Sequence, residues 1–324
     1  MDDGSRRAQL LSVKLGALVR DHLGSGDGLT PGEFGGGAAL TAAGAAWVLL
    51  DGQPERGLGA ALAWAVRRDA TTLHVLAERA TGLLARRAVH FGFPIQVWHV
   101  EGRVLLPAVA EPLPAATPVA AAHEQWRAAI AEGGATPIVE HGVLAGEVEG
   151  LEVCRVVTDA YTDEVRLEVG VGAHDREAFM MLHGNKPTTV ALAEVVEAVR
   201  THRRTGADRH PLNMLAQERA LRARLVAEPE LVDATTIEVA EPPVPRPNLK
   251  DPVPCVALAD IGGVPTAVVC SSGVDLDLVP FAVDARAALD VRDAIVVLPA
   301  RDAIDAQRRL AALAVPPIRV ITVG

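Results

Sequence analysis

One pattern occurs twice in this chain of 324 residues: a strand, a helix, a second strand, a second helix and a third strand. The first copy spans residues 46–100 and the second spans residues 265–323. Short apolar runs alternate in both copies with segments of helical periodicity, which is typical of β-α-β crossovers in a parallel sheet. The pattern predicts an α/β fold with two similar modules, and it places Val75 and Leu298 on equivalent buried strands.

The two copies also match residue by residue. Laid over each other without a gap, residues 74–100 agree with residues 297–323 at many positions, and Arg86 falls opposite Arg309. Both stretches continue from their second helix into the motif Pro-Ile-x-Val. Internal similarity of this kind indicates a repeated structural unit, so we expect the two modules to share one β-α-β-α-β topology.

Proline-rich segments divide the chain. Residues 107–120 and 241–254 have many prolines, and such segments are extended rather than packed. We therefore predict two linkers and three structured parts. These parts are an N-terminal α/β module with a leading helix at residues 1–106, a central α+β domain at residues 121–240, and a C-terminal α/β module at residues 255–324.

Composition excludes several classes of protein. Hydrophobic residues make up 49% and charged residues 22% of the chain, so we expect a packed core, and with only 3% aromatic residues that core is aliphatic. A formal net charge of -10 argues against a broad nucleic-acid-binding surface. The cysteines are far apart and form no CxxC motif, which indicates neither a disulfide framework nor a zinc ribbon. The N-terminus lacks the features of a signal peptide, and no apolar stretch is long enough to span a membrane. We expect a protein of the reducing cytoplasm with no membrane partner.

One segment is strongly basic. Its arginines include Arg200, Arg203, Arg204, Arg219 and Arg222. Such a segment can grip a phosphate, a nucleic-acid backbone or an acidic partner. The alternative is a solvated helix end, where arginine is favourable. The sequence assigns no other partner, and it allows a homo-oligomer.

Acidic side chains are densest in the central stretch. We expect residues 147–157 and 164–171 to be two strands of an antiparallel hairpin. Alternation along these strands allows either Glu152 or the pair Glu147 and Glu149 to lie across from Glu168. Clustered carboxylates bind Mg²⁺ or share a proton, so this face of the hairpin is a candidate site.

The candidate catalytic residues are Glu149, Glu152, Glu168 and Asp175, with Glu147 on the same strand as the first two. Glu152 and Glu168 are the candidate metal ligands, and Mg²⁺ or Mn²⁺ is the cofactor that they would hold. The alternative is that these acids form ion pairs with Arg155 or Arg166 on a solvated face of the sheet.

The order acid, turn, acid on adjacent strands resembles the core of restriction-endonuclease-like nucleases. That family follows the turn with an acid-x-Lys motif, whereas this chain has Glu168-Val169-Gly170 and lacks the lysine. The resemblance covers a short part of the chain. It implies an enzyme, or a degenerate enzyme, that acts on phosphates or nucleic acid through the central carboxylates.

Strand ends offer a second candidate site. Residues 271–275 follow an expected strand and precede a helix, and Asp51 occupies the matching place in the first module. Ligands of open α/β sheets bind at the carboxyl ends of strands. The glycine run at residues 35–37 precedes a strand rather than a helix, which indicates a flexible loop and not a phosphate-binding loop.

Three functions therefore stay open. The first is the phosphate- or nucleic-acid-directed enzyme just described. The second is a non-catalytic assembly or regulatory protein that uses its duplicated modules for contacts. The third is a protein that binds a small ligand at the strand ends of those modules.

Overall fold

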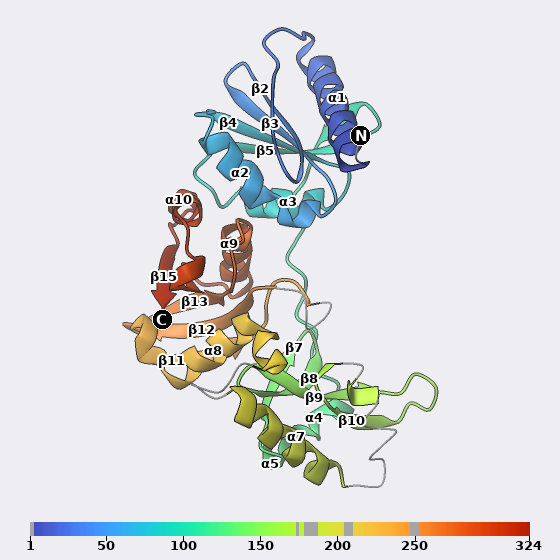
Figure 1. The fold of residues 1–324 in the computed structure, drawn as a ribbon, viewed down its shortest axis with the longest axis vertical. Helices are drawn as coiled ribbons and strands as arrows, with labels where there is room; N and C mark the ends of the chain where they lie inside the picture. The colour runs from blue at the N-terminus through green and yellow to red at the C-terminus, as the bar shows by residue number, and fades with distance from the viewer. Residues whose placement is uncertain (1–2, 173–174, 178–186, 204–209, 247–252) are drawn as a thin grey trace. The chain divides into compact units, whose positions relative to one another are not determined.

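The computed structural model describes residues 3–172, 175–177, 187–203, 210–246 and 253–324 (Figure 1). It is a mixed α/β structure with three sheets, so the fold class predicted from the sequence is confirmed. The chain forms two compact units. Unit 1 comprises Met1–Leu113, Val274–Val296 and Ala300–Thr322, and unit 2 comprises Pro114–Gly273, Val297–Pro299 and Val323–Gly324. Within the described ranges, no helix has both the length and the apolar character needed to cross a membrane.

The first sheet belongs to unit 1. Its strands, in spatial order, are β1 (Thr30–Gly32), β2 (Gly37–Ala42), β3 (Ala45–Leu50), β4 (Thr72–Ala77), β5 (Ile95–Glu101) and β6 (Val104–Pro107). β3, β4 and β5 are parallel to one another. The short helix η1 (Pro54–Arg56) and helix α2 (Leu58–Val66) connect β3 to β4, and α3 (Thr81–Ala88) connects β4 to β5.

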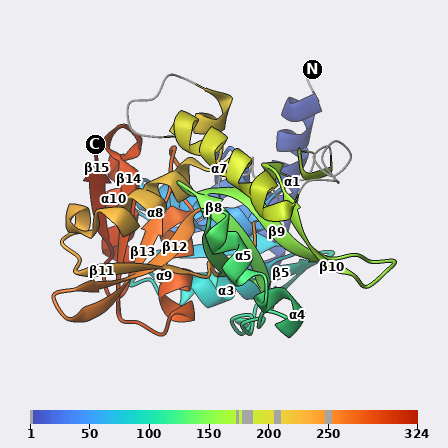
Figure 2. The ribbon, with the colours of Figure 1, turned by 90° about the horizontal axis from the view of Figure 1, so that it is seen from below.

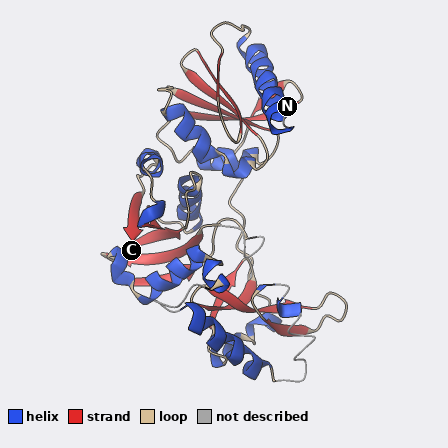
Figure 3. Ribbon diagram, viewed as in Figure 1, coloured by secondary structure: helices blue, strands red, loops and turns tan. Residues whose placement is uncertain are grey.

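Helix α1 (Asp3–Leu23) packs on one face of this sheet (Figure 3). Leu15 and Leu18 of the helix contact a cluster that includes Trp47 and Leu49 of β3. These residues recur at helical spacing on α1 and at alternate positions on the strand, so each element presents a single apolar face. Val48 points to the opposite face, which α2 covers.

A second sheet is formed by strands from the C-terminal part of the chain. Its strands, in spatial order, are β11 (Thr236–Ala240), β12 (Cys255–Ile261), β13 (Val264–Cys270), β14 (Asp293–Pro299) and β15 (Arg319–Val323). β12 and β13 form a hairpin around Gly262 and Gly263, whose positive φ values of 62° and 81° suit a two-residue turn. α9 (Leu278–Ala288) connects β13 to β14, and η4 (Ala300–Asp302) and α10 (Asp305–Leu313) connect β14 to β15.

The order hairpin, helix, strand, helix, strand thus occurs in both sheets, while the superposition of the two modules stays a prediction. α2 and α9 end in the same turn, with a φ of 51° at both Asp69 and Asp290. Counted from this turn, Val75 is level with Val296 rather than with Leu298. The gap-free sequence alignment therefore pairs different residues of this strand than an alignment that starts from the shared turn.

The third sheet belongs to unit 2 and is antiparallel throughout. Its strands, in spatial order, are β10 (Val165–Val169), β9 (Leu151–Thr158), β8 (Val143–Val148) and β7 (Thr136–Glu140). Helices α5 (Arg127–Glu132) and α7 (Thr188–Arg203) lie against it (Figure 2). Leu144, Val153 and Leu192 are fully buried in the core between these elements. The remaining helices of the unit are α4 (Ala121–Glu124), η2 (Pro211–Met214), α8 (Gln217–Ala227) and η3 (Pro229–Val232).

The predicted hairpin of β9 and β10 is present, but the single strand expected at residues 147–157 is wrong. A two-residue turn at Glu149 and Gly150 ends β8 and begins β9, with positive φ values of 47° and 74°. This turn reverses the chain, so Glu147 lies directly opposite Glu152 on the neighbouring strand. Left-handed backbone at a glutamate is uncommon, which is why alternation alone did not indicate the turn.

Candidate functional site

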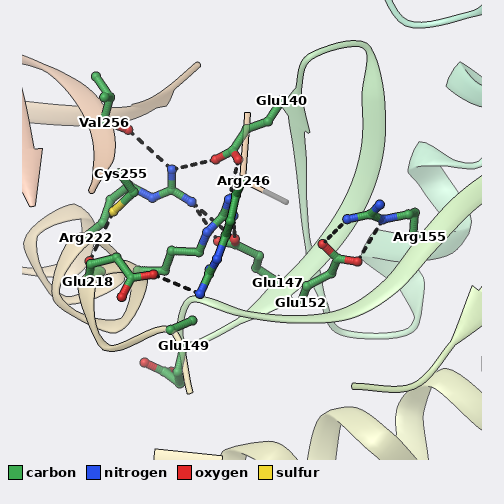
Figure 4. Close-up of polar contacts among 12 residues, drawn as sticks. Glu140, Glu147, Glu149, Glu152, Arg155, Glu218, Arg222, Arg246, Cys255 and Val256 are labelled. Carbon is green, nitrogen blue, oxygen red and sulfur yellow. Dashed lines mark hydrogen bonds and ion pairs between the residues drawn. The ribbon is translucent and has the colours of Figure 1, made fainter. Parts of the chain in front are cut away.

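Glu147 lies in a buried ion-pair cluster of unit 2 (Figure 4). α8 supplies Arg219 and Arg222 from one helix face, β7 supplies Glu140 and β8 supplies Glu147. Arg222 pairs with Glu147 at 3.0 Å and with Glu140 at 2.9 Å, and Arg219 pairs with both glutamates. Burial raises the pKa of Glu147, but Arg222 and Arg219 outweigh it and hold the pKa below its usual value. The cluster is therefore charge-balanced and joins α8 to the sheet.

Glu152 does not lie directly across from Glu168 as expected, because Glu168 is in register with Arg155. The two carboxylates share the guanidinium of Arg176 instead. Arg176 pairs with Glu152 at 3.1 Å and with Glu168 at 3.6 Å. Arg155 donates two hydrogen bonds of 2.9 Å to Glu152, and Arg166 donates one of 2.9 Å to Glu168. The two acids thus stand in ion pairs, which is the alternative that the sequence left open.

The other two candidate residues lie apart from this pair. Glu149 is exposed at the turn, and its side chain points away from Glu147 and Glu152 (Figure 4). Its backbone carbonyl accepts a hydrogen bond of 3.1 Å from Arg203. Asp175 is also exposed. Neither joins Glu152 and Glu168 in a common cluster of ion pairs.

Metal binding by these acids stays a prediction. In the part of the chain that the structure describes, no group of three or more His, Cys, Asp or Glu side chains is arranged to hold a metal ion. Glu152 and Glu168 would have to exchange their arginine partners for the cation, and the positive charge of Arg176 between them opposes that exchange.

The basic segment of the sequence does not form one solvated patch among the described residues. Arg219 and Arg222 are buried in the cluster with Glu147. Arg200 donates to the carbonyl of Gly134 at 2.7 Å, and Arg203 donates to several backbone carbonyls. Arg204 lies outside the described residues. The described arginines of this segment therefore hold the elements of unit 2 together.

The strand-end residues of unit 1 also have partners. Asp51 accepts hydrogen bonds of 2.7 and 3.0 Å from Arg7, which lower the pKa of its carboxyl group. Asp275 accepts one of 2.7 Å from Arg56. Both contacts connect loops that follow β3 and β13 to neighbouring segments of the unit.

A second buried charge cluster lies between α3 and α9 in unit 1. Arg86 donates two hydrogen bonds to the fully buried Asp284, at 2.8 and 3.0 Å. Arg87 pairs with Asp277 at 2.9 Å and with Asp284 at 3.2 Å. Burial raises the pKa of Asp277 to about 7, despite the nearby Arg87 and a hydrogen bond from the Gly59 amide.

Sequence reasoning missed a pocket of about 530 Å³ in unit 1. It lies between α2 and α10 and is closed by the loop of residues 33–36 and by Leu276 and Ile304. Its apolar wall includes Ala63 and Trp64 of α2 and Leu310 of α10. We call it the α2–α10 pocket.

Four charged residues line the α2–α10 pocket. They are Glu33, Arg67, Asp305 and Arg309. All four are exposed, so the charges stand at the rim while the apolar side chains form the interior. In the described part of the chain, neither Arg67 nor Arg309 forms an ion pair.

The expectation that ligands bind at the carboxyl ends of strands indicates one part of this pocket. Leu276 follows β13 and Ile304 follows β14, so two strand-end loops contribute to its wall. The expectation pointed to residues 271–275, next to Leu276. It did not indicate α2, α10 or the glycine-containing loop, because these approach one another only in the folded chain.

Comparisons of the chain with protein-family models, with curated proteins and with solved structures give no match.

Proposed function

We propose that this protein binds a small molecule in the α2–α10 pocket. The observation that carries the proposal is the pocket itself, at about 530 Å³ with an apolar interior and a few charged groups at its rim. Sites for small ligands are typically concave, mostly apolar, and about 300–1,000 Å³ in volume. The pocket has these properties and is built from the elements of a single unit.

The environment of the central acids supports binding rather than carboxylate catalysis. A general acid or base must be able to exchange a proton with a substrate, and a metal ligand must be able to give up its other partners. Glu147, Glu152 and Glu168 are each held by arginines. The two acids outside these ion pairs, Glu149 and Asp175, lie apart from them and are exposed.

A matched pair of variants tests the proposal. Ala306 lines the pocket from α10, whereas Ala312 is an exposed residue of the same helix that does not line it. A fragment library is screened by thermal shift against the unmodified protein, and the hits are measured again on Ala306→Phe and Ala312→Phe.

We expect fragments that raise the melting temperature of the unmodified protein and of Ala312→Phe but not of Ala306→Phe. The added ring fills space in the pocket, while the same ring at Ala312 projects into solvent. Circular dichroism checks that both variants fold. A screen without hits, or hits that Ala306→Phe still binds equally well, would overturn the proposal.

A further inference from the structure

We infer that the α2–α10 pocket binds a small amphipathic carboxylate, whose charged group pairs with Arg309. The inference rests on the proposed function, because it names the class of ligand for the same pocket. Two helix contacts of unit 1 support it, one between α3 and α9 and the other between α10 and α2.

The segments that follow α3 and α10 meet in a local twofold arrangement of the backbone. An isolated antiparallel bridge joins Phe91, just after α3, to Ala314, just after α10. Two reciprocal hydrogen bonds of 2.8 Å flank the bridge, from the Gly92 amide to the Leu313 carbonyl and from the Val315 amide to the His90 carbonyl. In a twofold arrangement of similar segments, each position on one side has a counterpart on the other. The contact of α3 with α9 therefore corresponds to that of α10 with α2.

The bridge identifies the counterpart of Arg86. Arg86 precedes Phe91 by the same number of residues as Arg309 precedes Ala314, and the two arginines are also opposite each other in the sequence alignment. Arg86 binds Asp284 through two hydrogen bonds between α3 and α9. Beside Arg309, a residue of α2 takes the place that Asp284 has beside Arg86.

The helix ends identify that residue as Ala63. Asp290 and Asp69 occupy the same left-handed position after α9 and α2, with a φ of 51° in each. Asp284 precedes Asp290 by the same number of residues as Ala63 precedes Asp69. At the second contact an alanine thus stands where the first has a buried carboxylate.

The pocket occupies the region of this missing carboxylate. Ala63 and Arg309 both line it, and in the described residues Arg309 has no ion-pair partner. A ligand carboxylate can take the role that Asp284 has at the first contact, since guanidinium and carboxylate groups match in a bidentate pair. The apolar part of the ligand would contact Trp64 and Leu310.

The remaining charges at the rim limit the charge of the ligand. Glu33 and Asp305 line the pocket together with Arg67 and Arg309. The two acids and two arginines balance, so the rim has no excess positive charge to offset the second charge of a dianion such as a phosphate monoester. The arrangement thus favours a monoanion with an apolar body.

Three probes with the same alkyl chain test this inference: octanoate, octylammonium and 1-octanol. Binding of each is measured by isothermal titration calorimetry to the unmodified protein, to Arg309→Gln and to the control Arg308→Gln. Arg308 is an exposed neighbour on α10 that does not line the pocket. We expect octanoate to bind most tightly of the three probes. Arg309→Gln should lower the affinity for octanoate by about tenfold and leave the affinity for 1-octanol unchanged. Arg308→Gln should leave the affinities for all three probes unchanged.

Ala63→Asp provides the converse test. It places a carboxylate at the position that corresponds to Asp284, so we expect it to raise the melting temperature by pairing with Arg309 and to abolish octanoate binding. If Ala63→Asp fails to fold, the result with Arg309→Gln decides.

Equal affinity for 1-octanol and octanoate, or no effect of Arg309→Gln, would overturn the carboxylate inference while the proposed function stands. If octanoate, 1-octanol and every library fragment fail to bind, both are overturned.

Discussion

Among the described residues, the fully or nearly buried carboxylates of both units face arginines. In unit 1, Asp284 is fully buried and accepts from Arg86 and Arg87. In unit 2, Glu147 has Arg219 and Arg222 as partners. An unpaired buried charge is far more costly than a paired one, so these side chains depend on one another. The consequences can be measured one residue at a time.

Asp277 should make unit 1 less stable as the pH rises. Its usual pKa is 3.8, and burial raises it to about 7 in the folded chain. Between these values the folded state holds a proton that the unfolded state has lost, so stability falls as the pH rises from about 4 to about 7. Asp277→Asn is always neutral and should remove this part of the pH dependence. Urea unfolding of both proteins across that range checks it, and identical pH profiles would contradict it.

Glu147→Gln should destabilise unit 2 by about 3 kcal/mol, because removal of one partner leaves buried positive charge uncompensated. Glu149→Gln is the matched control. Glu149 is exposed, so its substitution should change the free energy of unfolding by less than about 0.5 kcal/mol. Chemical denaturation of the three proteins gives both values. Equal effects of the two substitutions would show that the buried cluster does not stabilise the unit.

At the scale of elements, the sequence predicted types better than boundaries. The two glycines of the β12–β13 turn indicate a hairpin in the sequence, because glycine readily adopts left-handed φ values. The turn between β8 and β9 was missed because its first residue is Glu149, and the apolar pattern continues through it. The acids of this region were identified from the sequence. Arg155 and Arg166 were named as partners of Glu152 and Glu168. The partners of Glu147, Arg219 and Arg222, were not, since they lie more than 70 residues further along the chain.

The hairpin of β9 and β10 allows a direct test of the metal hypothesis. If Glu168 serves in ion pairs with Arg166 and Arg176, millimolar Mg²⁺ or Mn²⁺ should leave the melting temperature unchanged. Glu168→Gln should then cost less than about 1 kcal/mol, because these pairs are partly exposed. A metal-dependent rise in melting temperature that Glu168→Gln abolishes would instead establish a metal site.

At the scale of the whole molecule, the sequence showed similarity between two stretches but not how they pack. The α2–α10 pocket draws on residues 33–36, on α2, on the loop after β13 and on α10. The sequence of each of these segments predicts only an ordinary loop or an Ala-rich helix. Ala63 of α2 is one of the small side chains that line this cavity, and the sequence alone does not place it beside α10.

The chain should be cleaved first in the extended segment between the two units. Residues 108–120 form no helix or strand and are mostly exposed, and the boundary between Leu113 and Pro114 falls within them. Limited digestion with elastase should cut there before it cuts residues 143–169, because exposed extended segments are nicked first. The second predicted linker, residues 241–254, lies partly outside the described residues. First cuts inside the β8–β10 sheet would contradict the predicted linker.

The indole signal of Trp64 tests the central claim most directly. Its ring lines the α2–α10 pocket, and its N–H donates to the Glu33 carbonyl at 2.9 Å. Trp126, in unit 2, serves as the internal reference. In ¹H–¹⁵N spectra recorded during an octanoate titration, the Trp64 indole signal, assigned with Trp64→Phe, should shift and saturate while that of Trp126 stays in place. A stationary Trp64 signal, or a shift confined to Trp126, would contradict ligand binding in this pocket.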